Sequence, residues 1–380
     1  MGSQSDLSRR STRISGRAKA DTNARVGALL RDLASVQKSQ QSRWGYKRAA
    51  SAILTLEEPL EDLLQPDGTL RKIPGIGPAS TRVILEYLTS GTSPTVEKAV
   101  EESTRSGDVM RSRGLREHFL SRSQVAAALS DAKLRGPRVV DYRGDLQMHS
   151  EYSDGGDTLE EIIEGAIARG WQYCAVTDHS YGLPIAGGVP MEKLKQQHRE
   201  IEALNKKYKG RFRLLKGIEA NILADGRVDM TPKELRTLEI VVASPHSKLR
   251  SADDQTTRML TAVSTPGVHI LGHPRGRMFG SRPGVTADWD AVFTVAAKTG
   301  VAIEIDGDPS RQDIDYTLAR RAIKSGCLFA VDSDAHAVSQ FDFTDIALAH
   351  ARLAGVPKSR IINCWPLEKL LEWATGAWQR

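Results

Sequence analysis

The sequence predicts an α/β protein in which a small helical domain precedes a β/α barrel or layered sheet. Apolar residues recur at helical spacing in the first hundred residues, and strand-like and helix-like runs alternate beyond Val139. In addition, five of the nine histidines stand at the ends of apolar, strand-like runs: His149, His179, His246, His273 and His336. Strands of a β/α barrel end on one face, so these imidazoles are expected to converge there.

Length and composition fit two domains without a disulfide framework. The chain has 380 residues, 40% of them hydrophobic, and a formal net charge of +6. Basic residues concentrate in residues 1–50, which favours an anionic partner. Three cysteines lack CxxC spacing, and no apolar stretch is long enough to cross a membrane. We expect a cytoplasmic protein with no membrane partner.

The first domain is predicted to be helical. Residues 1–20 are rich in serine and arginine, which predicts a disordered basic tail. Within the domain, expected over 21–100, apolar spacing predicts one helix from Asn23 through Val36 and a second through Leu56. Residues 101–138 are expected to form a linker with one helix, and 139–380 the barrel.

A glycine-containing turn divides the helical domain. Ile73-Pro74-Gly75-Ile76-Gly77 precedes an apolar-periodic helix and is typical of a tight hairpin between helices. Such a helix-hairpin-helix turns backbone amides toward phosphates and grips nucleic acid without reading its sequence. The candidate nucleic-acid-binding residues are Gly75, Gly77, Ser80 and Arg82. A plain helical turn in a protein-interaction module is the alternative.

In the second domain, each strand-like run leads to a polar side chain. One strand is expected to end at His149 and the next at His179, with helices over 158–169 and 191–208. Further candidates are Asp154, Glu219, His246, His273, Asp334 and His336. Imidazole and carboxylate ligands suit zinc, manganese or iron, and eight such residues are too many for one tetrahedral ion. Two or three divalent metal ions are therefore expected. The remaining histidines are expected to be structural: His118, His198, His269 and His350.

Over about residues 142–373 the chain resembles the PHP (polymerase and histidinol phosphatase) family. The resemblance rests on Asp145-Leu146-Gln147-Met148-His149-Ser150, Ser153-Asp154-Gly155, Thr177-Asp178-His179-Ser180, Gly217-Ile218-Glu219, Ser244-Pro245-His246-Ser247, Gly272-His273-Pro274-Arg275-Gly276-Arg277 and Ser333-Asp334-Ala335-His336. It implies a distorted seven-stranded β/α barrel with a trinuclear metal site.

The resemblance also implies a distribution of ligands. Glu219 would bridge two ions, with His149 and Asp334 at the first, His246 and His273 at the second, and Asp154, His179 and His336 at the third. Gln147 departs from the family pattern, which has histidine there. A neutral glutamine oxygen is a poor substitute for imidazole on zinc, so the first site would bind loosely, exchange its metal, or favour manganese or magnesium.

The expected chemistry is phosphoester hydrolysis by metal-activated hydroxide. Glu219, Asp178 and Arg275 are the candidate catalytic residues. Arg275, together with Arg277, is expected to clamp the substrate phosphate, and Asp178 to orient His179 or an adjacent ligand.

Residues 23–100 resemble the N-terminal helix-hairpin-helix domain of family X DNA polymerases, whose bacterial members also carry a C-terminal PHP domain. The resemblance rests on Asn23, Tyr46-Lys47-Arg48-Ala49-Ala50, Leu70 and the 73–77 hairpin. Residues 101–138 are too few for a polymerase palm, and the stretch 80–84 has no lysine for lyase chemistry.

The leading hypothesis is a metal-dependent phosphoesterase acting on DNA ends in repair, as a 3′ nuclease or 3′-phosphatase. One alternative is a histidinol-phosphatase-like enzyme acting on small phosphorylated metabolites. The other is a non-catalytic DNA-binding scaffold with a degenerate metal site. The sequence leaves the substrate, the metals and the oligomeric state open.

Overall fold

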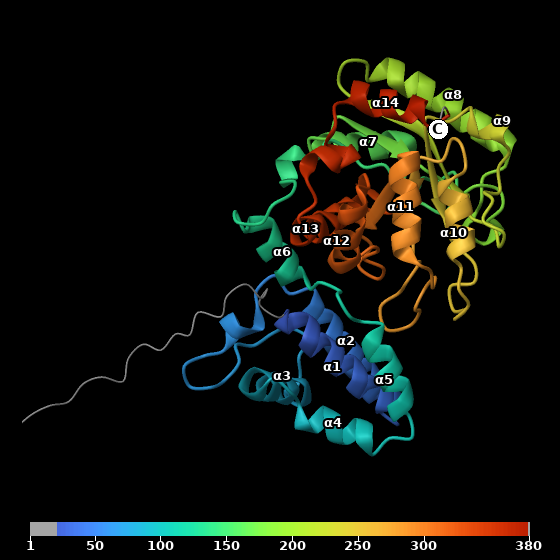
Figure 1. Ribbon diagram of the computed structural model, residues 1–380. Helices are drawn as coiled ribbons and strands as arrows, with labels where there is room; N and C mark the ends of the chain where they lie inside the picture. Colours follow the sequence, from blue (N-terminus) through green and yellow to red (C-terminus); the bar gives the residue numbers. More distant parts are fainter. Residues whose placement is uncertain (1–20, 379–380) are drawn as a thin grey trace, which may run out of the picture.

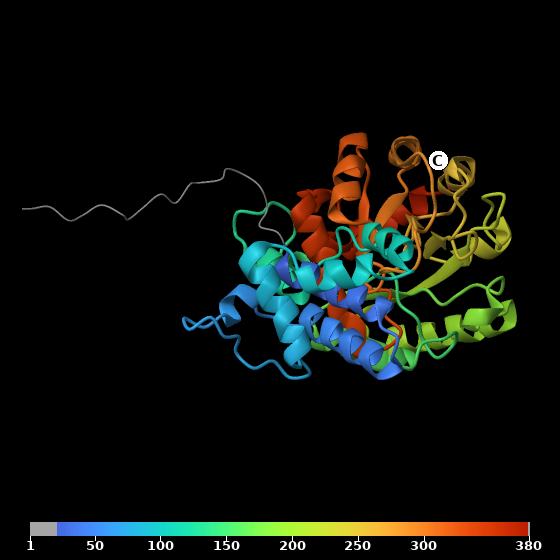
Figure 2. The same ribbon diagram turned by 90° about the horizontal axis from the view of Figure 1, so that it is seen from below.

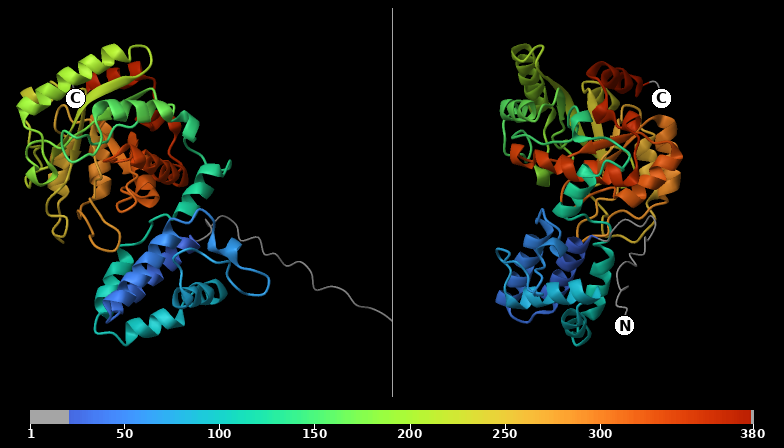
Figure 3. Two further views of the ribbon diagram at one scale, coloured as in Figure 1. Left: turned by 180° about the vertical axis from the view of Figure 1, so that it is seen from behind. Right: turned by 90° about the vertical axis from the view of Figure 1, so that its left-hand side faces the viewer.

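The computed structural model of the chain describes residues 21–378, so the predicted basic tail lies outside the described residues. A helical domain and a β/α domain lie one above the other in Figure 1. The C-terminal helix α14 (Leu367–Gly376) covers the end of the β/α domain farthest from the helical domain (Figures 1 and 3).

Four helices of the first domain share one apolar core. Helices α1 (Thr22–Val36) and α2 (Gln40–Leu54) confirm the two predicted helices, and α3 (Pro78–Ser90) and α4 (Pro94–Glu101) pack with them. Figure 2 shows these helices beside the β/α domain. Asp21 caps α1 by accepting a hydrogen bond from the amide of Ala24.

The predicted hairpin precedes α3, but no α-helix leads directly into it. The 3₁₀ helix η1 (Leu60–Leu63) comes first, followed by an antiparallel bridge between Leu64 and Leu70. Pro66-Asp67-Gly68 forms a turn there, which ends the helical path. Gly75 has a φ of 78°, which only glycine adopts readily, and Gly77 is the N-cap of α3.

The segment 101–138 contains two helices, where one was expected. Helix α5 (Ser106–Gly114) contributes Val109 to the core of the helical domain. Helix α6 (Arg122–Ser130) packs instead on α13 (Thr344–Ala354) of the second domain. The segment is thus divided between the two cores.

The second domain is built on a parallel sheet with strand order β1-β2-β3-β4-β5-β6. The strands are β1 (Tyr173–Val176), β2 (Arg213–Asn221), β3 (Ile240–Ser244), β4 (Ile270–Leu271), β5 (Ala302–Asp306) and β6 (Phe329–Asp332). Residues 145–149 lie between its two edges: the amide of Ala175 donates to the carbonyl of Asp145, and the amide of His149 donates to the carbonyl of Ala335. This segment hydrogen-bonds to both edges but forms only an isolated bridge, Met148 with Ala335, so within residues 21–378 the sheet has six strands where seven were expected.

Helices surround the sheet, and the two predicted ones are confirmed as α7 (Leu159–Ala168) and α8 (Met191–Lys207). Thr158 and Glu161 form a capping box at α7. The other α-helices are α9 (Pro232–Leu235), α10 (Thr256–Val263), α11 (Trp289–Thr299) and α12 (Tyr316–Ser325). Short 3₁₀ helices lie at η2 (Val139–Asp141), η3 (Pro184–Ala186), η4 (Val338–Phe343), η5 (Lys358–Arg360) and η6 (Ile362–Cys364).

Alternation along the strands positions the polar site. Inward residues near the strand starts, such as Leu215, Ala302 and Ala330, form an apolar core with Leu370 of α14. Two or four residues further along β2, β5 and β6, the same face carries acids: Glu219, Glu304, Asp306 and Asp332. The bottom of the barrel is therefore apolar and its C-terminal end is polar.

The connector from the helical domain reaches the C-terminal end of the barrel. The amide of Leu120 donates to the side chain of Gln312, which donates back to the carbonyl of Leu120. Phe119 packs edge-on against Phe279, and the guanidinium of Arg277 lies over the Phe119 ring. Loops following β4 and β5 thus contact the connector, and the polar end of the barrel faces the helical domain (Figure 1).

Candidate metal centre

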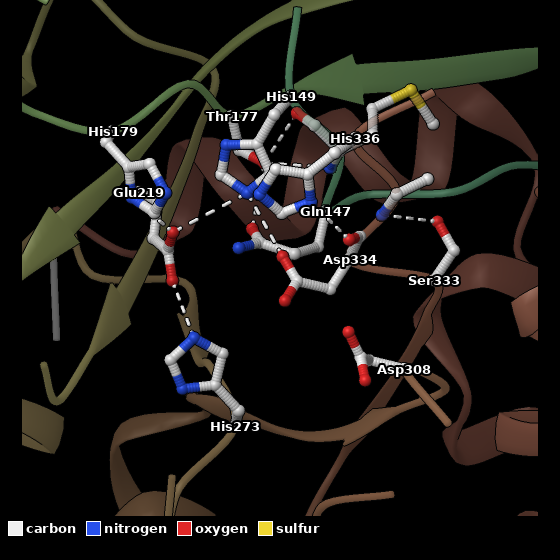
Figure 4. Close-up of polar contacts among 12 residues, drawn as sticks. Gln147, His149, Thr177, His179, Glu219, His273, Asp308, Ser333, Asp334 and His336 are labelled. Atoms are coloured by element: carbon white, nitrogen blue, oxygen red, sulfur yellow. Dashed lines mark hydrogen bonds and ion pairs between the residues drawn. The ribbon is translucent and has the colours of Figure 1, made fainter. Parts of the chain in front are cut away.

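Four of the five strand-end histidines face Glu219, and Figure 4 shows three of them, His149, His179 and His273. Glu219 is buried on β2, and both of its carboxylate oxygens face imidazoles. His179 Nδ1 and His149 Nε2 lie 2.8 and 3.7 Å from Oε2. His273 Nε2 and His246 Nε2 lie 2.9 and 3.5 Å from Oε1. One carboxylate therefore gathers donors from four strand ends.

Asp154 gathers the second set of imidazoles. Its carboxylate oxygens lie 3.8 Å from His149 Nδ1, 3.6 Å from His179 Nε2 and 3.5 Å from His336 Nε2. The ring of His149 stacks between those of His179 and His336, with centroids 4.4 and 4.3 Å away. His149 and His179 therefore lie between the two carboxylates.

Within residues 21–378, two groups of donor atoms are compact enough to hold a cation. One consists of His149, Asp154, His179 and His336, and the other of His179, Glu219 and His246, with donor atoms within 4.8 Å of one another in each. Several of these atoms are buried without a hydrogen bond, including both Glu219 oxygens and His246 Nε2. Unpaired buried polar atoms are costly, and a divalent ion would satisfy them together. The residues at both positions fit a metal.

Electrostatics at these groups favours a bound cation. Burial opposes charge on His179, yet the carboxylates of Glu219 and Asp154 raise its pKa to about 10. Burial likewise opposes charge on His336, but the hydrogen bond with Asp154 and the charge of Asp334 raise its pKa to about 9. Against the effect of burial, neighbouring imidazoles hold the pKa of Glu219 well below its ordinary value. Divalent ions would displace the imidazole protons.

At the first metal position implied by the family resemblance, the donor atoms are not arranged to hold a metal ion. Asp334 belongs to neither compact group. Its Oδ1 lies 3.0 Å from His149 Nε2, and its Oδ2 is bound by the guanidinium of Arg311. Gln147 is buried, with Oε1 accepting from Thr177 at 2.8 Å and Nε2 without a partner. Nε2 is a donor and cannot ligate a metal in this orientation.

The Asp178 carboxylate binds the loop that carries Asp154 and not the imidazole of His179. Its carboxylate accepts hydrogen bonds from the amide and hydroxyl of Ser150, the hydroxyl of Ser153 and the amide of Gln197. Ser153 directly precedes Asp154, so Asp178 positions that ligand. Asp178 was expected to orient His179 or an adjacent ligand. Within the part of the chain that the structure describes, no hydrogen bond joins its carboxylate to the His179 ring.

The expected phosphate clamp of Arg275 and Arg277 is wrong. Arg275 donates to Asp313 at 2.9 Å and to Asp315 at 2.6 Å. Arg277 donates to the carbonyls of Glu117, Arg311 and Gln312. Both guanidinium groups donate their hydrogen bonds to acceptors of the protein, because buried acceptors from distant loops surround them. They support the loop that carries Arg311.

Sequence analysis missed Arg311 and a layer of buried acids. Asp145, Glu304, Asp306 and Asp332 lie fully buried beneath the histidines. Burial, followed by repulsion from neighbouring acids, raises the pKa of Glu304, Asp306 and Asp145; burial also raises that of Asp332, to about 6. Asp306 and Asp332 end apolar runs as the histidines do, which was an available signal. Arg311 lies in a loop and gives none.

The four histidines expected to be structural lie outside the metal groups. His269 accepts from the amide of Val241, and His350 contacts Gln312. His118 contacts the Tyr316 hydroxyl. His198, on α8, belongs to neither metal group.

The predicted nucleic-acid-binding residues lie beside a groove in the helical domain. Arg82 is exposed, as are Gly75 and Gly77, but Ser80 is buried in the packed face of α3. The groove has a volume of about 890 Å³, and Arg71, Lys72 and Arg82 are among its lining residues. Ser80 is therefore poorly placed to meet a phosphate. No helix within 21–378 is both long and apolar enough to cross a membrane.

Comparison with known proteins finds similarity to a domain family and to several phosphate-ester enzymes. Residues 145–305 match the PHP domain. The chain is 37% identical over 227 residues to the DNA polymerase/3′-5′ exonuclease PolX of Bacillus subtilis, covering 60% of this chain but only 40% of that protein. It is 28% identical over 232 residues to the probable phosphatase TTE1963 of Caldanaerobacter subterraneus, covering 57% of this chain and 86% of that protein. A histidinol phosphate phosphatase structure from Lactococcus lactis, complexed with zinc, L-histidinol and phosphate, aligns with a TM-score of 0.39 at 15% identity over 55% of this chain and 94% of that one.

Proposed function

We propose that this chain, which carries a PHP domain over residues 145–305, is a metal-dependent phosphoesterase that acts on DNA ends. The observation that carries the proposal is Glu219, a fully buried carboxylate with two imidazoles facing each oxygen. Such a carboxylate is costly to bury unless cations neutralise it. Its position at the strand ends is where β/α barrels place their chemistry.

Divalent ions in such a site supply an activated water and neutralise charge on a phosphate. The protein residues keep the donors in place. Asp178 holds the loop bearing Asp154, and the carboxylate of Glu304 accepts from the amide of His273. The side chain of His336 is 30% exposed, compared with 0% for that of His149, so the Asp154 side is the more open one. Substrate would enter from this side.

DNA as the substrate is supported by the placement of the helical domain. Its connector contacts the loops after β4 and β5 at the polar end of the barrel. The groove beside the hairpin carries Arg71, Lys72 and Arg82. A backbone-binding module on the same side as the metal centre would hold a strand whose end is processed. Similarity to PolX, named as a 3′-5′ exonuclease, points the same way.

Hydrolysis is tested with labelled oligonucleotides ending in 3′-hydroxyl or 3′-phosphate, with and without manganese. His273→Ala should reduce turnover by about 10–100-fold, because loss of a residue that supports a metal site typically costs that much. His198→Ala, on the outer helix α8, is the matched control and should retain activity. Equal rates for both variants would refute the proposed centre, whereas absence of turnover in the wild type would favour the scaffold alternative.

The DNA half of the proposal is tested by reversing charge beside the hairpin. Arg82→Glu should weaken oligonucleotide binding and reduce the slope of log affinity against log salt by about 1, because one phosphate contact is lost. Lys195→Glu is the control, since Lys195 is exposed and pairs only locally with Glu192. The same affinity and slope in Arg82→Glu as in the wild type would contradict DNA binding at this surface.

A phosphatase of small metabolites is the second candidate. The probable phosphatase from Caldanaerobacter is matched over 86% of its length. This alternative predicts turnover of histidinol phosphate that is unaffected by Arg82→Glu. Rates with histidinol phosphate above those with oligonucleotides would favour it over DNA ends.

A further inference from the structure

We propose that the centre holds two metal ions and that the guanidinium of Arg311 replaces a third cation at Asp334. The inference rests on the proposed metal-dependent function but concerns the number of ions and not the substrate. It starts from the disagreement at the first position, where the donor set does not fit a metal. Three features of the described residues support it.

The first feature is the chemistry around Asp334. The guanidinium of Arg311 binds Oδ2 of Asp334, and its Nη1 lies 3.7 Å from Oδ2 of Asp306. A guanidinium is always charged and matches carboxylate geometry. A divalent ion at the Asp334 carboxylate would be repelled by the positive charge of this guanidinium.

The second feature is Gln147. The imidazole of the family pattern would offer a basic nitrogen, but the amide offers a neutral oxygen that already accepts from Thr177. Its buried Nε2 has no hydrogen-bond partner. If the amide is turned, its oxygen is still a weak ligand for zinc. Removal of an imidazole and addition of a guanidinium both disfavour a metal at this position.

The third feature is the support for the loop that carries Arg311. Arg277 donates to the carbonyl of Arg311 at 3.0 Å and to that of Gln312 at 2.7 Å. The side chain of Gln312 is buried, exchanges hydrogen bonds with the backbone of Leu120 and contacts His350 Nε2. Arg311 therefore extends from a pinned backbone and is not a mobile surface residue. Its cation is built into the site.

Metal content tests the inference independently of activity. Full-length protein is loaded with zinc, passed through a desalting column and measured by native mass spectrometry and elemental analysis. Two ions per chain are expected in the wild type and in Arg311→Lys, which keeps the charge. Three are expected in the double variant Gln147→His/Arg311→Met, which restores the imidazole and removes the charge.

Zinc-edge anomalous scattering from wild-type crystals gives a second measurement that needs no variant to fold. Two peaks are expected, one near Asp154 and one near Glu219 with His246, with none at Asp334. Three ions in the wild type, or only two in a folded double variant, would overturn the inference. A wild type with two ions that fails to cleave oligonucleotides would contradict the proposed function and leave the inference intact.

Discussion

Removal of the Asp178 carboxylate should loosen the Asp154 loop while leaving the barrel folded. Asp178 is fully buried, with Oδ1 accepting from the Ser150 amide and the Ser153 hydroxyl, and Oδ2 from the Ser150 hydroxyl and the Gln197 amide. Asp178→Ala leaves these donors without their acceptor. The serine hydroxyls can rotate, but the Ser150 amide and the Gln197 amide cannot escape burial by rotation.

Two buried donors without an acceptor, at about 1–3 kcal/mol each, predict a loss of about 2–6 kcal/mol in the free energy of unfolding. Asp178→Asn should cost only about 1 kcal/mol. Its oxygen can keep the bonds of Oδ1, and its amide can donate to Gln197 once that side chain turns, since Gln197 Oε1 is buried without a partner. Metal affinity of the Asp154 group should fall about 10–100-fold in the alanine variant and much less in the asparagine variant.

Urea unfolding of chelator-treated protein measures the stability, and competition with a chromogenic chelator measures metal affinity. Asp290→Ala is the control because Asp290 is exposed and pairs with Arg321 on the surface. Equal losses in the alanine and asparagine variants would refute the hydrogen-bonding argument. Unchanged metal affinity in Asp178→Ala would refute the positioning role.

The other predictions concern pH and the connector. In metal-free protein the raised pKa values of His179 and His336 should stabilise the fold fully below about pH 6.5, and this contribution should be lost as pH rises through 9 to 10; urea midpoints measured from pH 6 to 10 that showed no such decline would contradict it. Zinc binding at pH 7 should release protons, measurable as a dependence of calorimetric heat on buffer ionisation, because the ion displaces them from these imidazoles. Gln312→Ala should destabilise the connector by about 1–3 kcal/mol and speed proteolysis within 101–138, since two backbone groups of Leu120 lose their partner; cleavage as slow as in the wild type would count against this docking.

Most of the metal centre was predictable because its signal is local. Strand-like runs end at His149, His179 and His246, and parallel strands of a barrel end on one face whatever the details of packing. Period-two alternation similarly brings Glu219 to the interior of β2. The helical pattern of α1 and the capping box of α7 are also local properties. These features required no knowledge of distant contacts.

The binding partners of Arg275, Arg277 and Arg311 could not be predicted from nearby residues in the sequence. Arg275 and Arg277 follow His273 in sequence and were expected to face substrate, yet Asp313, Asp315 and the carbonyl groups of two other segments bind them. Arg311 lies in the loop after β5 and Asp334 directly follows β6, so the pairing of these two parallel strands brings them together. The direction of a long cationic side chain depends on which acceptors surround it.

The sequence by itself determined the alternation of strands and helices, the strand ends that carry the candidate metal ligands and the glutamine at position 147. The tertiary structure decided which cation neutralises each buried acid, and placed Arg311 at Asp334, Asp178 on the Asp154 loop and the helical domain on the polar face. The physical reason is that strand pattern follows from residues close in sequence, whereas charge pairing follows from residues of separate strands and loops that meet only when the strands pair.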